Sequence, residues 1–328
     1  MNSAQTSPTT PTSPNTPPDR ISPERHKPHW REVIEPRLMT SFGAVMERAS
    51  WGACRYTGAW IGLLFFNGFR RRREIAVRNV QLAMPGLSHA AAQRIARRSA
   101  QNFGMTLCEF LHMRAASPQE IRDYVGTDGI EHVLEGLKAG RGVILLTAHL
   151  GNWELMGARA AQDIPLTVVA RPSSNAGIQA HIGSIRAAQG IDVISKFDNA
   201  RASLQVLRAN KTLGILPDQH AGETGVLMPF FGRPTRFVTA VARLARFSGA
   251  PVVPAYGVRR TPWLADGRIN PYIAPPLSLF DNEDKSSDRE AAILEGTRRA
   301  VAQLEETVRR YPEQWLWMHR RWRGSEAE

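Results

Sequence analysis

The arrangement of apolar and polar residues along the chain predicts alternating strands and helices. Short apolar runs suit the strands of a buried parallel sheet, and longer segments with apolar positions three or four apart suit helices. Strands are predicted at 143–146, 166–170, 193–194, 212–216 and 252–258, an outer strand at 268–273, and a hairpin at 227–235. Helices are predicted at 88–115, 129–139, from 153 onward, and at 175–189, 199–210, 237–248 and 289–310. The pattern therefore indicates an α/β domain.

The strand at 143–146 leads into the stretch on which the functional interpretation rests. After the strand the chain reads Thr-Ala-His149-Leu-Gly151-Asn152-Trp-Glu154. Gly151 and Asn152 are typical of turns and helix starts, so His149 is predicted at the carboxyl end of the strand and Glu154 in the first helical turn. Ligands bind at this edge of an open α/β sheet. We expect the two side chains to meet there.

A histidine beside a carboxylate suits general base catalysis. His149 can take a proton near neutral pH, and Glu154 on its other ring nitrogen would fix the tautomer. No G-x-S-x-G elbow supplies a serine, so the hydroxyl that is activated would belong to the substrate. The alternative is a buried histidine capped by a nearby acid. A zinc site is disfavoured because H-E-x-x-H is absent and neither Cys54 nor Cys108 has a C-x-x-C partner.

The formal net charge of +12 implies an anionic partner. Nucleic acid, anionic lipid, a phosphorylated substrate and an acidic protein all fit this balance. Two cysteines far apart in the sequence give no disulfide framework, which fits a protein that faces the cytosol.

The first part of the chain raises the question of membrane contact. Residues 1–28 are rich in Ser, Thr and Pro and predict a disordered tail. Residues 56–69 carry no charge, and Arg70 to Arg73 follow at once. The run is shorter than the roughly 20 residues of a spanning helix, so we expect residues 29–73 to form a membrane-associating helical segment that lies at the interface. The alternatives are a single short membrane anchor and a core helix with a solvated basic end.

Several separated blocks resemble one family. They are T-A-H-L-G-N-W-E around His149, Arg73 with Asn79, L-P-D-Q-H around Asp218 with the later P-F-F-G, and the ending P-E-Q-W-x-W-x-H-R-R-W. Together they resemble the bacterial lipid A biosynthesis acyltransferases, the lauroyl/myristoyl transferase group within the lysophospholipid acyltransferase superfamily. Phosphatidylinositol mannoside acyltransferases are similar in the first block. Val80 departs from the leucine that is usual after the asparagine.

The resemblance implies both a fold and an activity. The fold would be glycerolphosphate-acyltransferase-like, with a mixed central sheet flanked by helices, and residues 74–328 would be the acyltransferase domain. The reaction would move a fatty acyl group from acyl-acyl carrier protein, or alternatively acyl-CoA, to a hydroxyl of an anionic membrane glycolipid. That acceptor would be a lipid A precursor, or else a phosphatidylinositol mannoside. No cofactor or metal is implied, and the enzyme would work at the cytoplasmic face of the inner membrane.

The resemblance also assigns roles to residues. His149 and Glu154 would be catalytic, and the backbone N–H groups of Gly151, Asn152 and Trp153 at a helix start would hold the oxyanion. Arg171 follows the predicted strand at 166–170, where a guanidinium suits phosphate, although a surface salt bridge is the alternative.

The third block supplies the other expected contacts. Asp218, Gln219 and His220 would support the site or contact the acceptor. Without the resemblance, P-D-Q-H would be only a turn.

Two other classes remain to be tested. A nucleic-acid-binding protein is suggested by the charge and by the tryptophans and arginines of the ending, but the resemblance argues against it and no nucleic acid is expected. A hydrolase that uses water in place of the acceptor hydroxyl shares the predicted chemistry.

Overall fold

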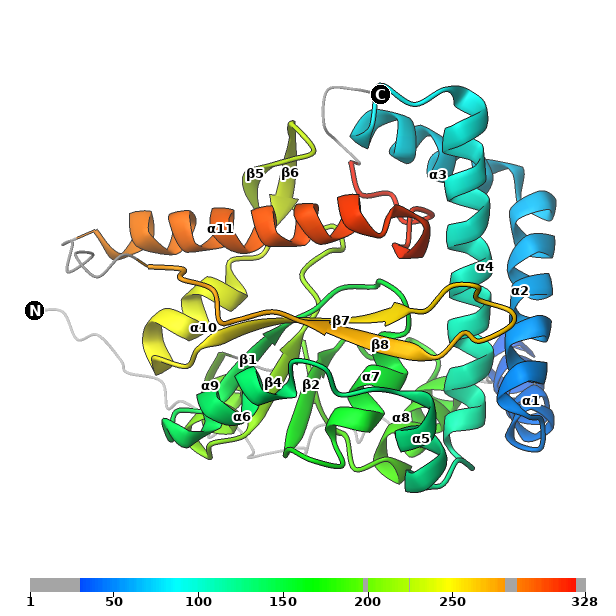
Figure 1. The fold of residues 1–328 in the computed structure, drawn as a ribbon, viewed down its shortest axis with the longest axis horizontal. Helices are drawn as coiled ribbons and strands as arrows, with labels where there is room; N and C mark the ends of the chain where they lie inside the picture. The colour runs from blue at the N-terminus through cyan, green and yellow to red at the C-terminus, as the bar shows by residue number, and fades with distance from the viewer. Residues whose placement is uncertain (1–29, 197–199, 224, 281–287, 323–328) are drawn as a thin grey trace, which may run out of the picture.

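A six-stranded sheet forms the centre of the molecule (Figure 1). The computed structural model describes residues 30–196, 200–223, 225–280 and 288–322. The strands lie in the order β3-β2-β4-β1-β7-β8, of which β8 is antiparallel to its neighbour β7 and the others are parallel. Their bounds are Val143–Leu146 (β1), Leu166–Ala170 (β2), Asp192–Ser195 (β3), Thr212–Ile215 (β4), Val252–Arg259 (β7) and Ile269–Ile273 (β8). The expected α/β architecture with a mixed central sheet is confirmed.

Helices cover both faces of this sheet, which is why its central strands are apolar throughout. Val143 and Leu145 of β1 pack into one core cluster, and Ile144 and Leu146 pack into another. The first cluster includes residues of α5 (Pro118–Tyr124), α6 (Ile130–Lys138), α7 (Trp153–Ala160) and α8 (Ala176–Ala188). The second includes residues of α9 (Ala200–Arg208), α10 (Ala240–Ser248) and α11 (Arg289–Arg310). Both faces of β1 are thus covered, so residues that follow its carboxyl end are the ones that can become accessible to a ligand.

A helical layer stands at one end of the sheet (Figure 1). It consists of α1 (Trp30–Glu47), α2 (Trp51–Gly68), α3 (Arg70–Ala83) and α4 (His89–Met113). No helix in the described part of the chain is both long and apolar enough to cross a bilayer. The expected tail at 1–28 lies outside the described residues, and the boundary between residues 73 and 74 stays a prediction.

A third core cluster joins this helical layer to the end of the chain. It packs α3 and α4 against the hairpin β5 (Val226–Phe230) and β6 (Arg233–Phe237), against α11, and against Trp315, Trp317 and Trp322 after the short 3-10 helix η1 (Pro312–Gln314). The tryptophan-rich ending is therefore packed core rather than a free tail.

Most predicted elements are found close to their expected bounds. The helix expected at 88–115 is α4, with Ser88 accepting a hydrogen bond from the N–H of Ala91 as its N-cap. The short helix α5 was not predicted. Its signal is local, since Ser117 and Glu120 form a capping box and Pro118 is the first helical residue.

Helices α2 and α4 approach each other through glycines. A Cβ atom on Gly104 would lie 2.1 Å from the carbonyl oxygen of Gly58, and one on Gly62 would lie 2.2 Å from that of Ala100. Only residues without a side chain permit this approach. Because Asn102 and Thr106 of α4 contact Gly151 just beyond β1, this contact fixes α2 relative to the carboxyl end of that strand.

Replacement of Gly104 by alanine should destabilise the protein. The added methyl group would force α2 and α4 apart, and overpacking of this kind costs about 1–3 kcal/mol. Urea unfolding would measure the loss. The control is Gly183→Ala in α8, where nothing lies within 4 Å of the new Cβ, so helix propensity should leave stability unchanged or raised by up to about 1 kcal/mol. Equal effects of the two substitutions would contradict the close approach.

Candidate active site

The adjacent parallel strands β1 and β4 bring His149 and Asp218 together. The last residues of the two strands, Leu146 and Ile215, are paired, and His149 and Asp218 each lie three residues beyond them. The ring Nδ1 of His149 lies 2.8 Å from Oδ1 of Asp218. Parallel strands present their carboxyl ends at one sheet edge, so residues far apart in sequence become neighbours there.

Asp218 is almost fully buried and accepts three hydrogen bonds. Besides the imidazole contact, Oδ2 accepts the backbone N–H of His149 at 2.9 Å and the indole N–H of Trp315 at 2.9 Å. Burial raises the pKa of Asp218, but the charge of His149 and these hydrogen bonds outweigh burial, so its net pKa is below the usual value. Asp218 is therefore an ionised, fixed partner for the imidazole.

The second ring nitrogen of His149 faces the accessible side. The side chain is 21% exposed, Nε2 lies 3.2 Å from the amide nitrogen of Gln219, and the ring of Trp153 stands edge-on at 5.0 Å. With the Nδ1 proton donated to Asp218, Nε2 carries the lone pair. Burial lowers the pKa of His149, but the charge and hydrogen bond of Asp218 raise it more, and its net pKa lies above the usual value.

The expected contact between Glu154 and the His149 ring is wrong. Glu154 pairs instead with Arg186 of α8, whose Nη2 and Nε lie 2.6 and 3.1 Å from its two oxygens. Glu154 does lie in the first turn of α7, as expected, but Nδ1 of His149 is already bonded to Asp218, and the Glu154 carboxylate pairs with the neighbouring helix α8. Glu154 still contributes to the raised pKa of His149 through its charge.

Gly151 and Asn152 are structural rather than substrate-facing. Both are buried, and their N–H groups donate to the carbonyls of Gln314 at 3.0 Å and Gly257 at 2.7 Å. These two groups are therefore not available to hold an oxyanion, which corrects the expectation. Gly151 has a φ of +62°, and a Cβ there would lie 1.9 Å from the oxygen of Gly257, so this position requires glycine.

The segment that follows α11 pairs directly with residues 149–152, the turn between β1 and α7. We call these residues the catalytic turn, after the predicted base His149. The N–H of Leu316 donates to the carbonyl of His149 at 3.1 Å, next to the contact from Gly151 to Gln314. Asn79 of α3 holds the same segment through its side-chain amide, which donates to the carbonyls of Trp317 and His319 at 2.8 Å each. Asn79 is thus a brace for this segment.

Trp315 and Gln314 are site residues that the residue patterns did not reveal. Only the resemblance of the ending to the family pointed to them, because a tryptophan after a helix is normally expected to pack in the core. The charge of Arg186 was visible in the sequence, but its pairing with Glu154 was not.

The remaining predicted residues lie around the same edge. Arg171 is exposed at the end of β2, next to β4 in the sheet. His220 is half-buried, and its Nδ1 accepts the N–H of Gly222 at 2.8 Å, which ties it to its own turn. Gln219 is exposed beside His149. Arg171 and Gln219 can thus reach a ligand, whereas one ring nitrogen of His220 is already hydrogen-bonded within its own turn.

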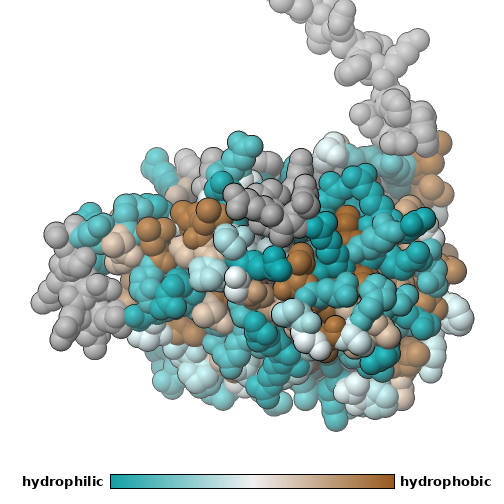
Figure 2. All heavy atoms as spheres, turned by 90° about the horizontal axis from the view of Figure 1, so that it is seen from above, coloured by the Kyte–Doolittle hydropathy of each residue, from teal (hydrophilic) through white to brown (hydrophobic). Residues whose placement is uncertain are grey.

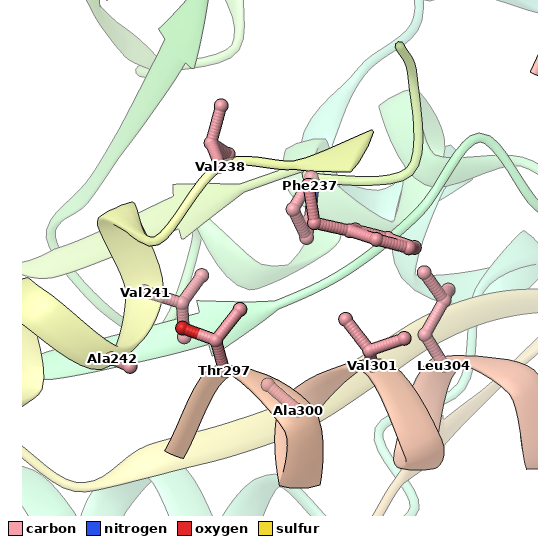
Figure 3. A pocket seen from close by; sticks show the side chains of 9 residues that line it. Phe237, Val238, Val241, Ala242, Thr297, Ala300, Val301 and Leu304 are labelled. Carbon is pink, nitrogen blue, oxygen red and sulfur yellow. The ribbon is translucent and has the colours of Figure 1, made fainter. Parts of the chain in front are cut away.

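An apolar crevice adjoins the Asp218 loop (Figure 3). Side chains of α11 face those of β6 and α10 across it (Figure 3), and Pro217, which precedes Asp218, belongs to its wall. The lining is Pro217, Phe237, Val238, Val241, Ala242, Thr297, Ala300, Val301 and Leu304. The hydroxyl of Thr297 is satisfied by the carbonyl of Ile293, so the crevice presents hydrocarbon.

The site does not have the form of a metal centre. Among the residues that the structure describes, no three His, Cys, Asp or Glu side chains gather in a way that could hold a metal ion. The chemistry available is that of a histidine with a buried carboxylate partner.

Comparisons with known proteins agree with these features. The chain is 24% identical over 300 residues to the lipid A biosynthesis palmitoleoyltransferase of Escherichia coli (strain K12), covering 89% of this chain and 94% of that protein. It is 25% identical over 274 residues to the lipid A biosynthesis lauroyltransferase of the same organism, covering 81% and 84%. It is 26% identical over 198 residues to the phosphatidylinositol mannoside acyltransferase of Mycolicibacterium smegmatis, covering 59% and 60%.

The family match covers most of the chain, including the catalytic turn, the Asp218 loop and the tryptophan-rich ending. The family model described as bacterial lipid A biosynthesis acyltransferase matches residues 39–324. The protein is therefore an O-acyltransferase that belongs to the bacterial lipid A biosynthesis acyltransferase family.

Proposed function

We propose that this enzyme transfers a fatty acyl chain from an acyl thioester to a hydroxyl of a membrane glycolipid, with His149 as the base. The observation that carries the proposal is the His149–Asp218 pair at the carboxyl edge of the sheet, with Nε2 turned outward. The names of the relatives support a lipid A precursor as acceptor, and a phosphatidylinositol mannoside is the alternative. Acyl-acyl carrier protein is the proposed donor, with acyl-CoA as the alternative.

The reaction follows from the two ring nitrogens. Nε2 of His149 removes the proton of the acceptor hydroxyl, whose oxygen attacks the thioester carbonyl carbon. Asp218 stabilises the imidazolium that forms, as the acid of a Ser-His-Asp triad does. When the carbon–sulfur bond breaks, the proton passes to the leaving thiolate. Gln219 occupies the place of the hydroxyl next to Nε2 and must give way to it.

The first turn of α7 and the nearby cations would handle negative charge. The N–H groups of Trp153 and Glu154 begin α7, and a helix start stabilises an oxyanion. Glu154 holds Arg186 beside the site, and Arg171 is exposed at the neighbouring strand end. Phosphate groups of the acceptor or donor suit these guanidinium groups.

We also propose that the helical layer docks on an anionic membrane surface. Tyr56, Trp60 and Leu64 recur every fourth residue along α2 and are 51–65% exposed. Leu38 and Val45 of α1 are 65% and 60% exposed, and hydrophobic residues lie among polar ones at this end of the molecule (Figure 2). The arginines that begin α3 follow directly. An apolar face beside cations is typical of interfacial helices. The cytoplasmic face of the inner membrane is the proposed location.

Loss of the base should abolish most of the transfer. His149→Ala should lower kcat about 10²- to 10⁴-fold, the usual contribution of a general base. The measurement uses purified protein in detergent, labelled lauroyl-acyl carrier protein, and a tetra-acylated lipid A precursor, resolved by thin-layer chromatography. Parallel reactions replace the acceptor with a phosphatidylinositol mannoside or with buffer. Undiminished turnover in the folded variant would refute the mechanism, and free laurate without acceptor dependence would indicate a hydrolase.

The pH profile should distinguish Asp218 from Glu154. The base works as neutral imidazole, so wild-type kcat/KM should fall as pH drops through a His149 pKa above the usual value of about 6.5. Of the two carboxylates, Asp218 raises the pKa of His149 more. In Asp218→Asn the fall of kcat/KM at acid pH should therefore move to lower pH, and the kcat/KM reached at high pH should also drop. Glu154→Gln is the matched change and should move the fall at acid pH less. A larger shift in Glu154→Gln would reassign the partner of the base.

Charges on the exposed face of α2 should weaken membrane binding. Trp60→Glu with Leu64→Glu removes two side chains whose burial is worth about 1.5–3 kcal/mol each, so sedimentation with phosphatidylglycerol-containing vesicles should fall at least about tenfold. Leu294→Glu on α11 is the matched control, since Leu294 is also exposed, and it should bind as wild type does. Equal loss in the control would exclude a specific docking face.

A further inference from the structure

A buried ion pair lies beneath the catalytic turn. Glu109 of α4 and Arg259 at the end of β7 have side chains with no exposed surface. Nη1 and Nη2 of the guanidinium donate to the two carboxylate oxygens at 2.8 and 2.6 Å. Neither residue belongs to the blocks that indicated the reaction.

The carboxylate of Glu109 is saturated with donors. Oε1 accepts from Arg259 and from the hydroxyl of Tyr124 at 2.8 Å, and Oε2 accepts from Arg259 and from the side-chain amide of Asn152 at 2.7 Å. An ionised carboxylate has about four acceptor positions and no proton to donate. An ionised acid is therefore the group that fits this place.

Two of these contacts lead to the turn between His149 and α7. Asn152 donates to Glu109 with its amide nitrogen and caps α7 with its amide oxygen, which accepts the N–H of Leu155 at 3.0 Å. Arg259 holds Asn102 through Nε at 3.1 Å, and Asn102 in turn donates to the carbonyl of Gly151 at 3.1 Å. The ion pair is therefore hydrogen-bonded to Asn152 directly and to Gly151 through Asn102.

We infer that Glu109 and Arg259 are positioning residues for acyl transfer, acting through Asn152 and Gly151. They fix the turn that sets the direction of His149 and the start of α7, where the oxyanion donors are proposed. This inference rests on the proposed function for its catalytic consequence. Its structural content, the fixed turn, stands independently of the substrate.

The energetics of buried ion pairs favour this role over simple stabilisation. Removing two charges from water costs several kcal/mol each, and well-packed apolar residues often stabilise a core as well or better. A stability role alone would not require that the acid also reach the catalytic turn. The saturated carboxylate instead imposes fixed directions on every donor around it, including the one that caps α7.

The test removes the hydrogen bond between Asn152 and Glu109 and keeps both buried charges in place. Glu109→Ala or Arg259→Ala would leave an unpaired charge and are expected to unfold the protein, so they decide nothing. Asn152→Ser keeps an N-cap oxygen for α7 but loses the donor to Glu109. Tyr124→Phe is the matched control, because it removes a hydrogen bond of similar length to the other oxygen of the same carboxylate and leaves Asn152 in place.

Two measurements are made on the full chain in detergent. Hydrogen exchange of the peptide containing Gly151 and Asn152 should become at least about fivefold faster in Asn152→Ser, equivalent to the loss of one hydrogen bond. Its kcat should fall about ten- to a hundredfold with KM unchanged, because a turn displaced by about 1 Å misorients the base. Tyr124→Phe should lower the urea midpoint, yet keep wild-type exchange in this peptide and kcat within about twofold.

Each outcome decides the inference. Wild-type exchange and kcat in Asn152→Ser would overturn it, as would equal losses in the two variants in proportion to their stability. If the wild-type protein transfers no acyl group, the proposed function fails, and the exchange data still show whether the Glu109–Arg259 pair fixes the turn.

Discussion

The carboxylate of Asp218 connects the parts of the molecule that form the site. It accepts the backbone and the ring of His149 from β1 and the indole of Trp315 from the segment after α11, while its own backbone continues β4. In a buried setting each of these hydrogen bonds is stronger than in water, and an unpaired carboxylate there would be costly. The sheet edge, His149 and the segment after α11 are therefore ordered together.

Glu109 has the same character on the opposite side of the turn. Two buried acids, each surrounded by donors, thus hold the catalytic turn from both sides: Asp218 holds the imidazole and Glu109 holds the start of α7. Helix α4 supplies Glu109, and its glycine contact with α2 links this support to the helical layer with the exposed apolar face. The proposed membrane contact and the chemistry therefore share one rigid element.

The sequence predicted the elements well and the partnerships poorly. Apolar runs located β1, β2, β4 and β7 because central strands sealed on both faces must be apolar. The same reasoning placed His149 correctly at a strand end. It failed for Glu154 because closeness along the chain suggested a contact, whereas the ring of His149 is bonded to Asp218 and Glu154 to Arg186, both distant in sequence. The partner role of Asp218 depends on β4 lying beside β1 in a given register, which local patterns do not encode. The role of Trp315 likewise depends on a long-range contact.

The pairing of Leu316 and Gln314 with the catalytic turn has a consequence for the biosynthesis of the enzyme itself. The strand that carries His149 is made near the middle of synthesis, whereas the residues that complete its surroundings are among the last of the described chain to be made. A nascent or prematurely terminated polypeptide that already carries α2 lacks the indole that secures Asp218. The surroundings of His149 are therefore completed only after nearly all of the described chain has been made.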